Sequence, residues 1–254
     1  MPPRGSLGKR LRKEPCGPTC PGKCRLVVPV YTACKRERLC DLVDPGLLLS
    51  FGDGRHPLHE YLEAQNKLLR GVRDLEAKQR DPLPKDGNAF VAMVRDAHAT
   101  LFRYVFPETA GEFRGPADEV TFGGPSRRNI RDGYPDDAIE EGVKASFRLA
   151  NRADGPPARR AAAFLAQFFR VHPFSDGNGR IGRFIVQKIC RRDGFYVARW
   201  DTSGKSRRRY ISSLEYAHRG STRSVEWHDK TIVHLEHWIK RQLSPIDFED
   251  PFAG

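Results

Sequence analysis

The chain has 254 residues, 39% of them hydrophobic, which is enough for one sizeable core with extensions. Its net charge of +12 favours anionic partners, and this excess fits a nucleotide, a nucleic acid or an acidic target protein equally well. No apolar run is long enough to span a bilayer, and no apolar signal segment follows the basic N-terminus. We therefore expect a globular cytoplasmic protein that does not contact a membrane.

Residues 1–50 differ in composition from the rest, because they are basic and rich in proline and glycine. Five of the six cysteines lie there, at Cys16, Cys20, Cys24, Cys34 and Cys40. Their spacing matches no common zinc finger, and disulfides are disfavoured in a cytosol. A thiol-bound metal, a poorly ordered tail and a start codon placed too far upstream remain alternative interpretations. Residues 26–32 could form one short strand, which the proline within them would confine to a sheet edge.

Two helices are expected next. Leucines, valine and tyrosine recur every three or four residues from His56 to Leu75, and residues 81–87 break the pattern. A second helix is predicted over 89–106, ending before Pro107. His98 lies among apolar neighbours in this helix, so we interpret it as a core histidine rather than a catalytic one.

The segment from Gly111 to Gly124 has glycine and proline at its turn and alternating apolar residues, which predicts a small β-hairpin. Residues 126–135 are expected to form a loop. A further helix is predicted over 136–150, with acidic residues at its start where the helix dipole favours them.

Residues 159–171 are apolar on most sides and predict a buried central helix that ends at His172, since Pro173 cannot continue it. Beyond the next loop, an apolar stripe indicates a second anchored helix, with Gly194 as its terminator. The stripe consists of Ile181, Phe184, Ile185 and Ile189. Cys190 in the same helix is interpreted as a small core residue.

The loop between these two helices reads H-P-F-S-D-G-N-G-R-I-G-R over residues 172–183, and core packing alone does not explain that composition. Two glycines around an asparagine predict a turn opening a helix, where unpaired N–H groups form an anion site. Arg180 and Arg183 are three residues apart, so both can reach a polyphosphate. Asp176 suits Mg²⁺ beside phosphates, and His172 suits removal of a hydroxyl proton near neutral pH.

This run resembles the Fic family signature, H-x-F-x-[D/E]-G-N-G-R-x-x-R, at every specified position. Enzymes of that family usually transfer AMP from Mg·ATP to a Ser, Thr or Tyr hydroxyl of another protein. The resemblance implies that His172 is the catalytic base, Phe174 a buried anchor and Asp176 the magnesium ligand.

The resemblance further implies that Gly177, Asn178 and Gly179 cradle the phosphates of ATP, while Arg180 and Arg183 clamp them. Transfer of UMP, phosphocholine or a plain phosphate is the alternative within the family. Gly179 argues against the phosphate-transferring variant, which has a lysine at that position. The predicted hairpin at 111–124 resembles the family's flap, which aligns a target protein by strand addition.

Beyond the signature, residues 199–209 end in a cluster of cations and contain G-K-S, but the remainder of a phosphate-binding loop is missing. We interpret them as a solvated loop. Helices are predicted over 210–217 and 227–243. His234 and His237 in the latter fit an amphipathic helix better than a metal site.

We predict a mostly α-helical, Fic-type domain with a small β-hairpin flap. The predicted organisation is a basic cysteine-rich segment at 1–50, a catalytic domain at 55–200 and a helical extension at 201–254. A nucleic-acid-binding regulator is the rival from another class, although no helix-turn-helix or finger pattern supports it. Family members often carry an inhibitory helix, [S/T]-x-x-x-E-[G/N], which this chain matches only in part around Glu141 and Glu226. We therefore expect restraint by an inhibitory partner protein in trans.

Overall fold

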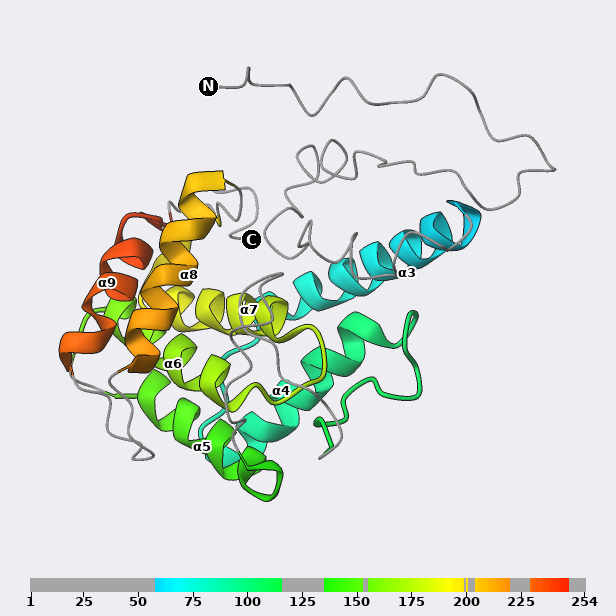
Figure 1. Cartoon of the computed structure of the whole chain (residues 1–254), viewed down its shortest axis with the longest axis horizontal. Coiled ribbons are helices and arrows are strands. Elements are labelled where there is room, and N and C mark those ends of the chain that lie inside the picture. The colour runs from blue at the N-terminus through cyan, green and yellow to red at the C-terminus, as the bar shows by residue number, and fades with distance from the viewer. Residues whose placement is uncertain are drawn as a thin grey trace, which may run out of the picture.

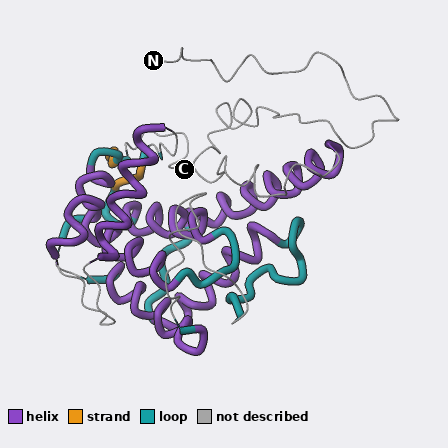
Figure 2. The backbone as a smooth tube through the Cα atoms, viewed as in Figure 1, coloured by secondary structure: helices purple, strands orange, loops and turns teal. Residues whose placement is uncertain are grey.

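The computed structural model describes residues 58–115, 135–152, 155–198, 200, 204–219 and 229–246, which are mostly α-helical (Figures 1 and 2). The predicted helical fold class is confirmed. The predictions for residues 1–50, including the cysteines and the short strand, lie outside the described residues. Most of the predicted flap lies outside them too, and its described part, 111–115, is turn and coil.

The first described helices form an antiparallel pair. Helix α3 spans Leu58–Ala77 and continues into the 3-10 helix η3 (Lys78–Arg80), and α4 spans Gly87–Phe102. The Asp86 side chain accepts a hydrogen bond from the Ala89 N–H at 2.9 Å and so caps α4. In Figure 1, the N-terminal part of α3 extends beyond the other described helices. The predicted end of α4 at residue 106 is wrong: the N–H groups of Val105 and Phe106 both turn back to the Phe102 carbonyl at 2.8 Å, and this tightens the chain into a turn.

The central layer consists of three helices. After η5 (Asp136–Ala138) come α5 (Ile139–Ala150), α6 (Pro157–Val171) and α7 (Asn178–Arg191). Helix α6 is buried along most of its length, as the sequence predicted, and it packs against both α5 and α7. The predicted apolar stripe of α7 is fully buried. Gly194 follows α7 with a positive φ of 77°, which makes it the expected terminator.

The C-terminal helices complete the same core. Helix α8 (Gly204–Arg219) lies beside α9 (Asp229–Lys240), and α9 packs on α6 (Figure 1). Trp200, Tyr210 and Trp238 pack their rings together, with centroids 4.9–6.1 Å apart. The hydrophobic core therefore continues from the predicted catalytic domain, 55–200, into the predicted extension, 201–254.

Two short strands close this end of the molecule (Figure 2). Strand β1 (Phe195–Val197) pairs antiparallel with β2 (Leu243–Pro245), and Tyr196 lies opposite Ser244. The sequence placed residue 243 at the end of a helix, and this is wrong: α9 stops at Lys240 because the chain turns to pair with β1.

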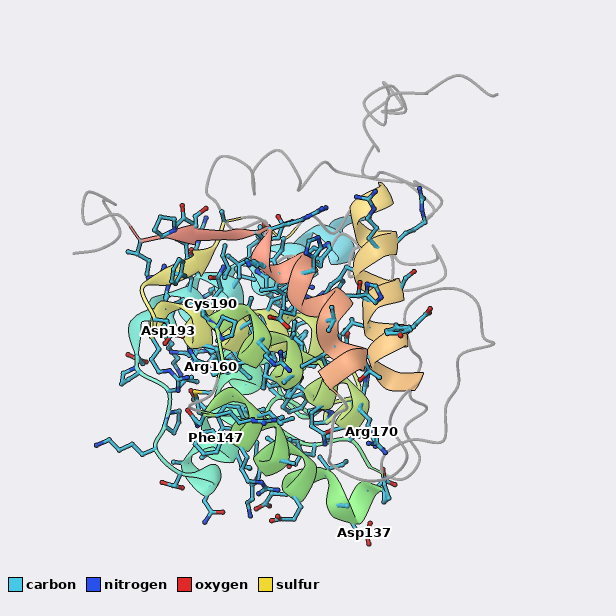
Figure 3. All side chains as sticks on the ribbon, turned by 90° about the vertical axis from the view of Figure 1, so that its left-hand side faces the viewer. Asp137, Phe147, Arg160, Arg170, Cys190 and Asp193 are labelled. Carbon is cyan, nitrogen blue, oxygen red and sulfur yellow. The ribbon has the colours of Figure 1, made fainter. Side chains whose placement is uncertain are left out.

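Polar contacts tie α7 to its neighbours. Lys188 is 4% exposed and donates to the carbonyls of Lys78 and Asp81, at 2.5 and 2.6 Å, at the end of η3. Burial lowers the pKa of this lysine to about 8. Arg160 of α6 forms an ion pair with Asp193, next to the buried Cys190 (Figure 3). Burial raises the pKa of the Cys190 thiol to about 12, so this cysteine is an inert core residue, as predicted.

No described helix is long and apolar enough to cross a membrane.

The crossing of α3 and α4 depends on Gly71. A Cβ at this position would lie 2.1 Å from the Leu101 carbonyl oxygen, which belongs to the rigid backbone of α4. Alanine normally stabilises a helix interior by about 1 kcal/mol relative to glycine, but overpacking against a backbone atom at this distance should cost about 3 kcal/mol and so outweigh that gain. We therefore expect Gly71→Ala to lower the urea midpoint of unfolding measured by circular dichroism.

Gly115→Ala is the matched control, because a Cβ there meets no described atom within 4 Å. Its unfolding midpoint should stay close to that of the parent. An unchanged midpoint for Gly71→Ala would show that the two helices do not approach this closely.

Candidate active site

The site begins where α6 ends. His172 is the C-terminal cap of this helix, and its N–H donates to the Phe168 carbonyl at 2.9 Å. Its backbone is left-handed, with φ 48° and ψ 62°, and no other described residue except glycine has a positive φ. A left-handed backbone costs a side-chain-bearing residue about 1–2 kcal/mol. The surrounding contacts must therefore hold this turn in place.

The loop that follows is closed by Phe174 and Asn178. The Phe174 N–H donates to the Asn178 side-chain oxygen at 3.0 Å, and the Asn178 amide donates back to the Phe174 carbonyl at 2.6 Å. Both residues are buried, with 0% and 3% of their surface exposed. Phe174 also stacks on His98, with ring centroids 3.9 Å apart. Phe174 is thus the buried anchor that the resemblance implied, while Asn178 closes the loop with its side chain.

Helix α7 begins at the predicted turn. Gly177 is its N-cap with φ 79°, and a Cβ there would lie 2.3 Å from the Phe102 ring, so both its conformation and the available space require glycine. The N–H groups of Arg180 and Ile181 donate to the Gly177 carbonyl. The first N–H groups of a helix have no acceptor within that helix, and the dipole is positive at this end. The start of α7 therefore has the geometry that binds phosphate.

Both signature arginines lie on the first turns of α7. Arg180 and Arg183 are 3% and 4% exposed, so the arginine face that the sequence predicted is largely buried. The Arg180 guanidinium lies over the Phe102 ring, 5.6 Å from its centroid. A Cβ on Gly179 would lie 3.4 Å from the Arg183 Nη1 atom, so this glycine leaves room beside the guanidinium. Burying a cation is costly, and an incoming polyphosphate would offset part of that cost.

Asp176 differs from these neighbours because it is exposed. Its Oδ1 atom accepts a hydrogen bond from the Gly177 N–H at 2.6 Å, which leaves its other oxygen available for a ligand. Within the described ranges, no three His, Cys, Asp or Glu residues form a group that could hold a metal ion. A cation at Asp176 would therefore take its remaining ligands from phosphate oxygens and water, the arrangement that Mg²⁺ favours.

The His172 ring has the electrostatics of a base. Burial and, to a lesser extent, the positive charge of Arg114 lower its pKa to about 4, against the opposing effect of a hydrogen bond with the Phe169 backbone. The imidazole is consequently neutral at physiological pH and can accept a proton. The structure thus brings the predicted base, carboxylate, glycine turn and arginines together on one loop and the first turns of one helix.

His98 supports this loop from α4. The Gly111 N–H donates to His98 Nδ1 at 2.9 Å, so the proton of the neutral ring lies on Nε2, 3.2 Å from the Asp176 carbonyl. Burial lowers the pKa of His98 to about 4, and the residue is 6% exposed. It is a core histidine, as the sequence indicated, but one that also contacts the candidate site.

Arg114 is the site residue that sequence reasoning missed. Its Nε donates to the His172 carbonyl and its backbone N–H to the Pro173 carbonyl, both at 2.9 Å. No local pattern pointed to it, because its partners lie 58 residues away along the chain. Asp136, which forms an ion pair with Arg114, lacked a local signal for the same reason.

Part of the chain is similar in sequence to known proteins. Residues 90–190 match the sequence model described as the Fic/DOC family. A probable protein adenylyltransferase of Aquifex aeolicus (strain VF5) is 34% identical over 78 residues, which cover 31% of this chain and 23% of that protein. The match therefore spans less than a quarter of the length of that relative.

Solved structures share the fold. A Fic domain containing signalling protein of Bacteroides thetaiotaomicron VPI-5482 superimposes with a TM-score of 0.54 and 18% identity, over 81% of this chain and 79% of that one. The BepC effector protein of Bartonella tribocorum, with bound AMPPNP, gives a TM-score of 0.51 and 18% identity, over 80% and 89% of the two chains. At these identities the similarity establishes the fold alone.

The fold and site define a helical domain in which a short loop joins a left-handed histidine to a helix that begins at a glycine with positive φ. The signature at 172–183 and the match over 90–190 show a domain of the Fic/DOC family in this part of the chain.

The lowered pKa values of His98 and His172 predict how stability depends on pH. His98 and His172 have folded-state pKa values near 4, below the ordinary value of 6.5, so the unfolded chain binds more protons between these limits. Burial of the two neutral rings imposes no protonation cost above pH 6.5, and the free energy of unfolding falls as the pH drops from 6.5 towards 4. Within that window, each histidine should lower the free energy of unfolding by up to about 1.4 kcal/mol for each pH unit.

Urea unfolding at several pH values measures this slope. His98→Gln should make it shallower, whereas His237→Gln, on the exposed side of α9, should leave it as in the parent. An equal slope in the parent and in His98→Gln would show that His98 titrates in the folded state as it does in the unfolded chain.

Proposed function

We propose that this protein transfers AMP from Mg·ATP to a Ser, Thr or Tyr hydroxyl of a target protein. The observation that carries the proposal is a neutral His172 joined through one short loop to an N-terminal helix turn with two buried arginines. The name of the Aquifex relative supports AMP transfer, and the AMPPNP bound to BepC supports a site for ATP.

In the proposed reaction, His172 accepts the proton of the target hydroxyl while the oxygen of that hydroxyl bonds to the α-phosphorus of ATP. The bond between the α-phosphorus and the bridging oxygen to the β-phosphate breaks, and pyrophosphate leaves. The start of α7 and the guanidinium groups of Arg180 and Arg183 would bind the phosphates and offset the charge on the leaving group. Asp176 would hold Mg²⁺, which neutralises phosphate charge when bound.

The target protein is proposed to dock at residues 111–124. The described part of this segment supports that position, because the Arg114 N–H is bonded to the Pro173 carbonyl, next to His172. A target aligned there would come close to the proposed base.

Restraint is proposed to come from a separate partner protein. Glu141 is exposed on α5, and its carboxylate lies 2.8 Å from Lys144. Because Lys144 lies on the same helix, this contact does not bring Glu141 to the phosphate site. Glu226, the other partial match to the inhibitory motif, lies outside the described residues.

Incubation with α-³²P-labelled ATP, Mg²⁺ and a cell lysate tests the reaction. The parent should label a protein band, and EDTA should abolish the label. His172→Ala should lose at least about 100-fold in transfer while keeping its affinity for ATP in calorimetry, since the imidazole acts on the incoming hydroxyl.

His237→Ala is the matched control, because this histidine is exposed on α9. It should label the band as the parent does. Equal labelling by His172→Ala would exclude His172 as the base, and labelling only by other nucleotides would reassign the transferred group.

If Arg183 binds the distal phosphates of ATP, its removal should lower the affinity for ATP more than the affinity for AMP. Arg183→Ala should weaken ATP binding by about 10-fold or more, as expected for the loss of a charge-assisted contact, while AMP binding changes little. Isothermal calorimetry with both nucleotides measures the difference. Arg148→Ala removes the same charge from an exposed site on α5 and should leave both affinities unchanged. Equal losses for ATP and AMP would show that Arg183 does not contact the distal phosphates.

A further inference from the structure

The left-handed turn at His172 needs support that α6 itself does not provide. The last carbonyls of a helix have no donor within the helix. At the end of α6, the carbonyls of Val171, His172 and Pro173 follow one another through the turn. Three donors of one residue, Arg114, approach these consecutive carbonyls.

The geometry of Arg114 matches the turn. Its Nε lies 2.9 Å from the His172 oxygen, its backbone N–H 2.9 Å from the Pro173 oxygen and its Nη2 3.5 Å from the Val171 oxygen. The first two contacts are good hydrogen bonds, and the third is at the limit of one. A planar guanidinium can hold such an array because its donors are fixed relative to one another, whereas an ammonium group cannot.

Arg114 is itself held in place. Its side chain is 4% exposed, and its Nη1 forms an ion pair with Asp136, which is 32% exposed. A buried guanidinium with an anchoring carboxylate is rigid. The two residues also lie on either side of residues 116–134, so the pair joins the chain just before and just after that segment.

The positive charge of Arg114 also stabilises the turn at His172. The guanidinium faces carbonyls at the C-terminal, negative end of α6, where a cation is stabilised. Its positive charge also opposes protonation of the His172 ring. The same group therefore supports both the conformation and the neutral state of the histidine.

We propose that Arg114 is a positioning residue for the transfer reaction, and that it fixes the left-handed turn that carries the His172 imidazole. This inference rests on the proposed role of His172 as the base. Arg114 acts through the backbone of His172, so its loss should slow the chemical step and leave nucleotide binding at α7 intact.

Steady-state kinetics of Arg114→Lys tests this inference. Lysine retains the charge but not the fork of donors, so kcat should fall about 10- to 100-fold, as expected for a misplaced base, with the KM for ATP within about two-fold. Arg148→Lys, an exposed substitution of the same kind on α5, should keep parental kcat and KM. Parental kcat for Arg114→Lys would overturn the proposal. A lower kcat together with a raised KM and a lowered melting temperature would overturn it too, because that combination indicates general structural damage.

Asp136→Asn provides a second variant if Arg114→Lys does not fold. It removes only the carboxylate that anchors the guanidinium, so kcat should fall at unchanged KM, and parental kcat would again count against the proposal.

Amide hydrogen exchange of residues 168–174, followed by mass spectrometry, separates this inference from the proposed function. Exchange should be faster in Arg114→Lys than in the parent, whether or not the parent transfers AMP. Unchanged exchange would show that Arg114 does not hold the turn. A parent that labels no protein would instead refute the proposed function.

Discussion

The site depends on one short connection between two tightly packed helices. Helices α6 and α7 are joined by residues 172–177, and a Cβ on Gly182 would lie 3.2 Å from both Leu165 and Phe169 of α6. A connection this short between helices this close must reverse sharply. The left-handed His172 and the positive φ of Gly177 supply the reversal, and the paired hydrogen bonds between Phe174 and Asn178 close it.

Burial has opposite consequences for the histidines and the arginines of the site. It keeps the rings of His98 and His172 neutral, because a charged imidazole loses its hydration in the interior. Arginine stays charged under the same conditions, so Arg114, Arg180 and Arg183 retain positive charge in a region of low dielectric. A neutral imidazole beside buried guanidinium groups is the arrangement that the proposed chemistry on a polyphosphate requires.

The C-terminal helices also contribute to the site, although they carry none of its residues. Leu235 and Ile239 of α9 belong to the same hydrophobic core as α6. Because α6 is covered by α5, α7 and α9, its C-terminal end has little freedom to move. The precision of the histidine turn is therefore a property of the whole core, and not only of the signature.

The amino-acid sequence was sufficient to predict the helical class, the buried character of residues 159–171 and the glycine turn that opens α7. These features are local, since apolar periodicity, proline and glycine act over a few neighbouring residues. The signature also identified the candidate base, carboxylate and arginines, because they lie within twelve consecutive positions, 172–183.

The contacts that hold those residues in place became visible only in the folded structure. The contacts of Arg114 with His172, of His98 with Asp176 and of Arg114 with Asp136 join residues 58, 78 and 22 positions apart. Likewise, α9 ends before Leu243 because that residue pairs with Val197, on a strand far earlier in the chain. No periodicity encodes such pairings, since they exist only once the helices have packed and brought distant backbone groups within hydrogen-bond distance.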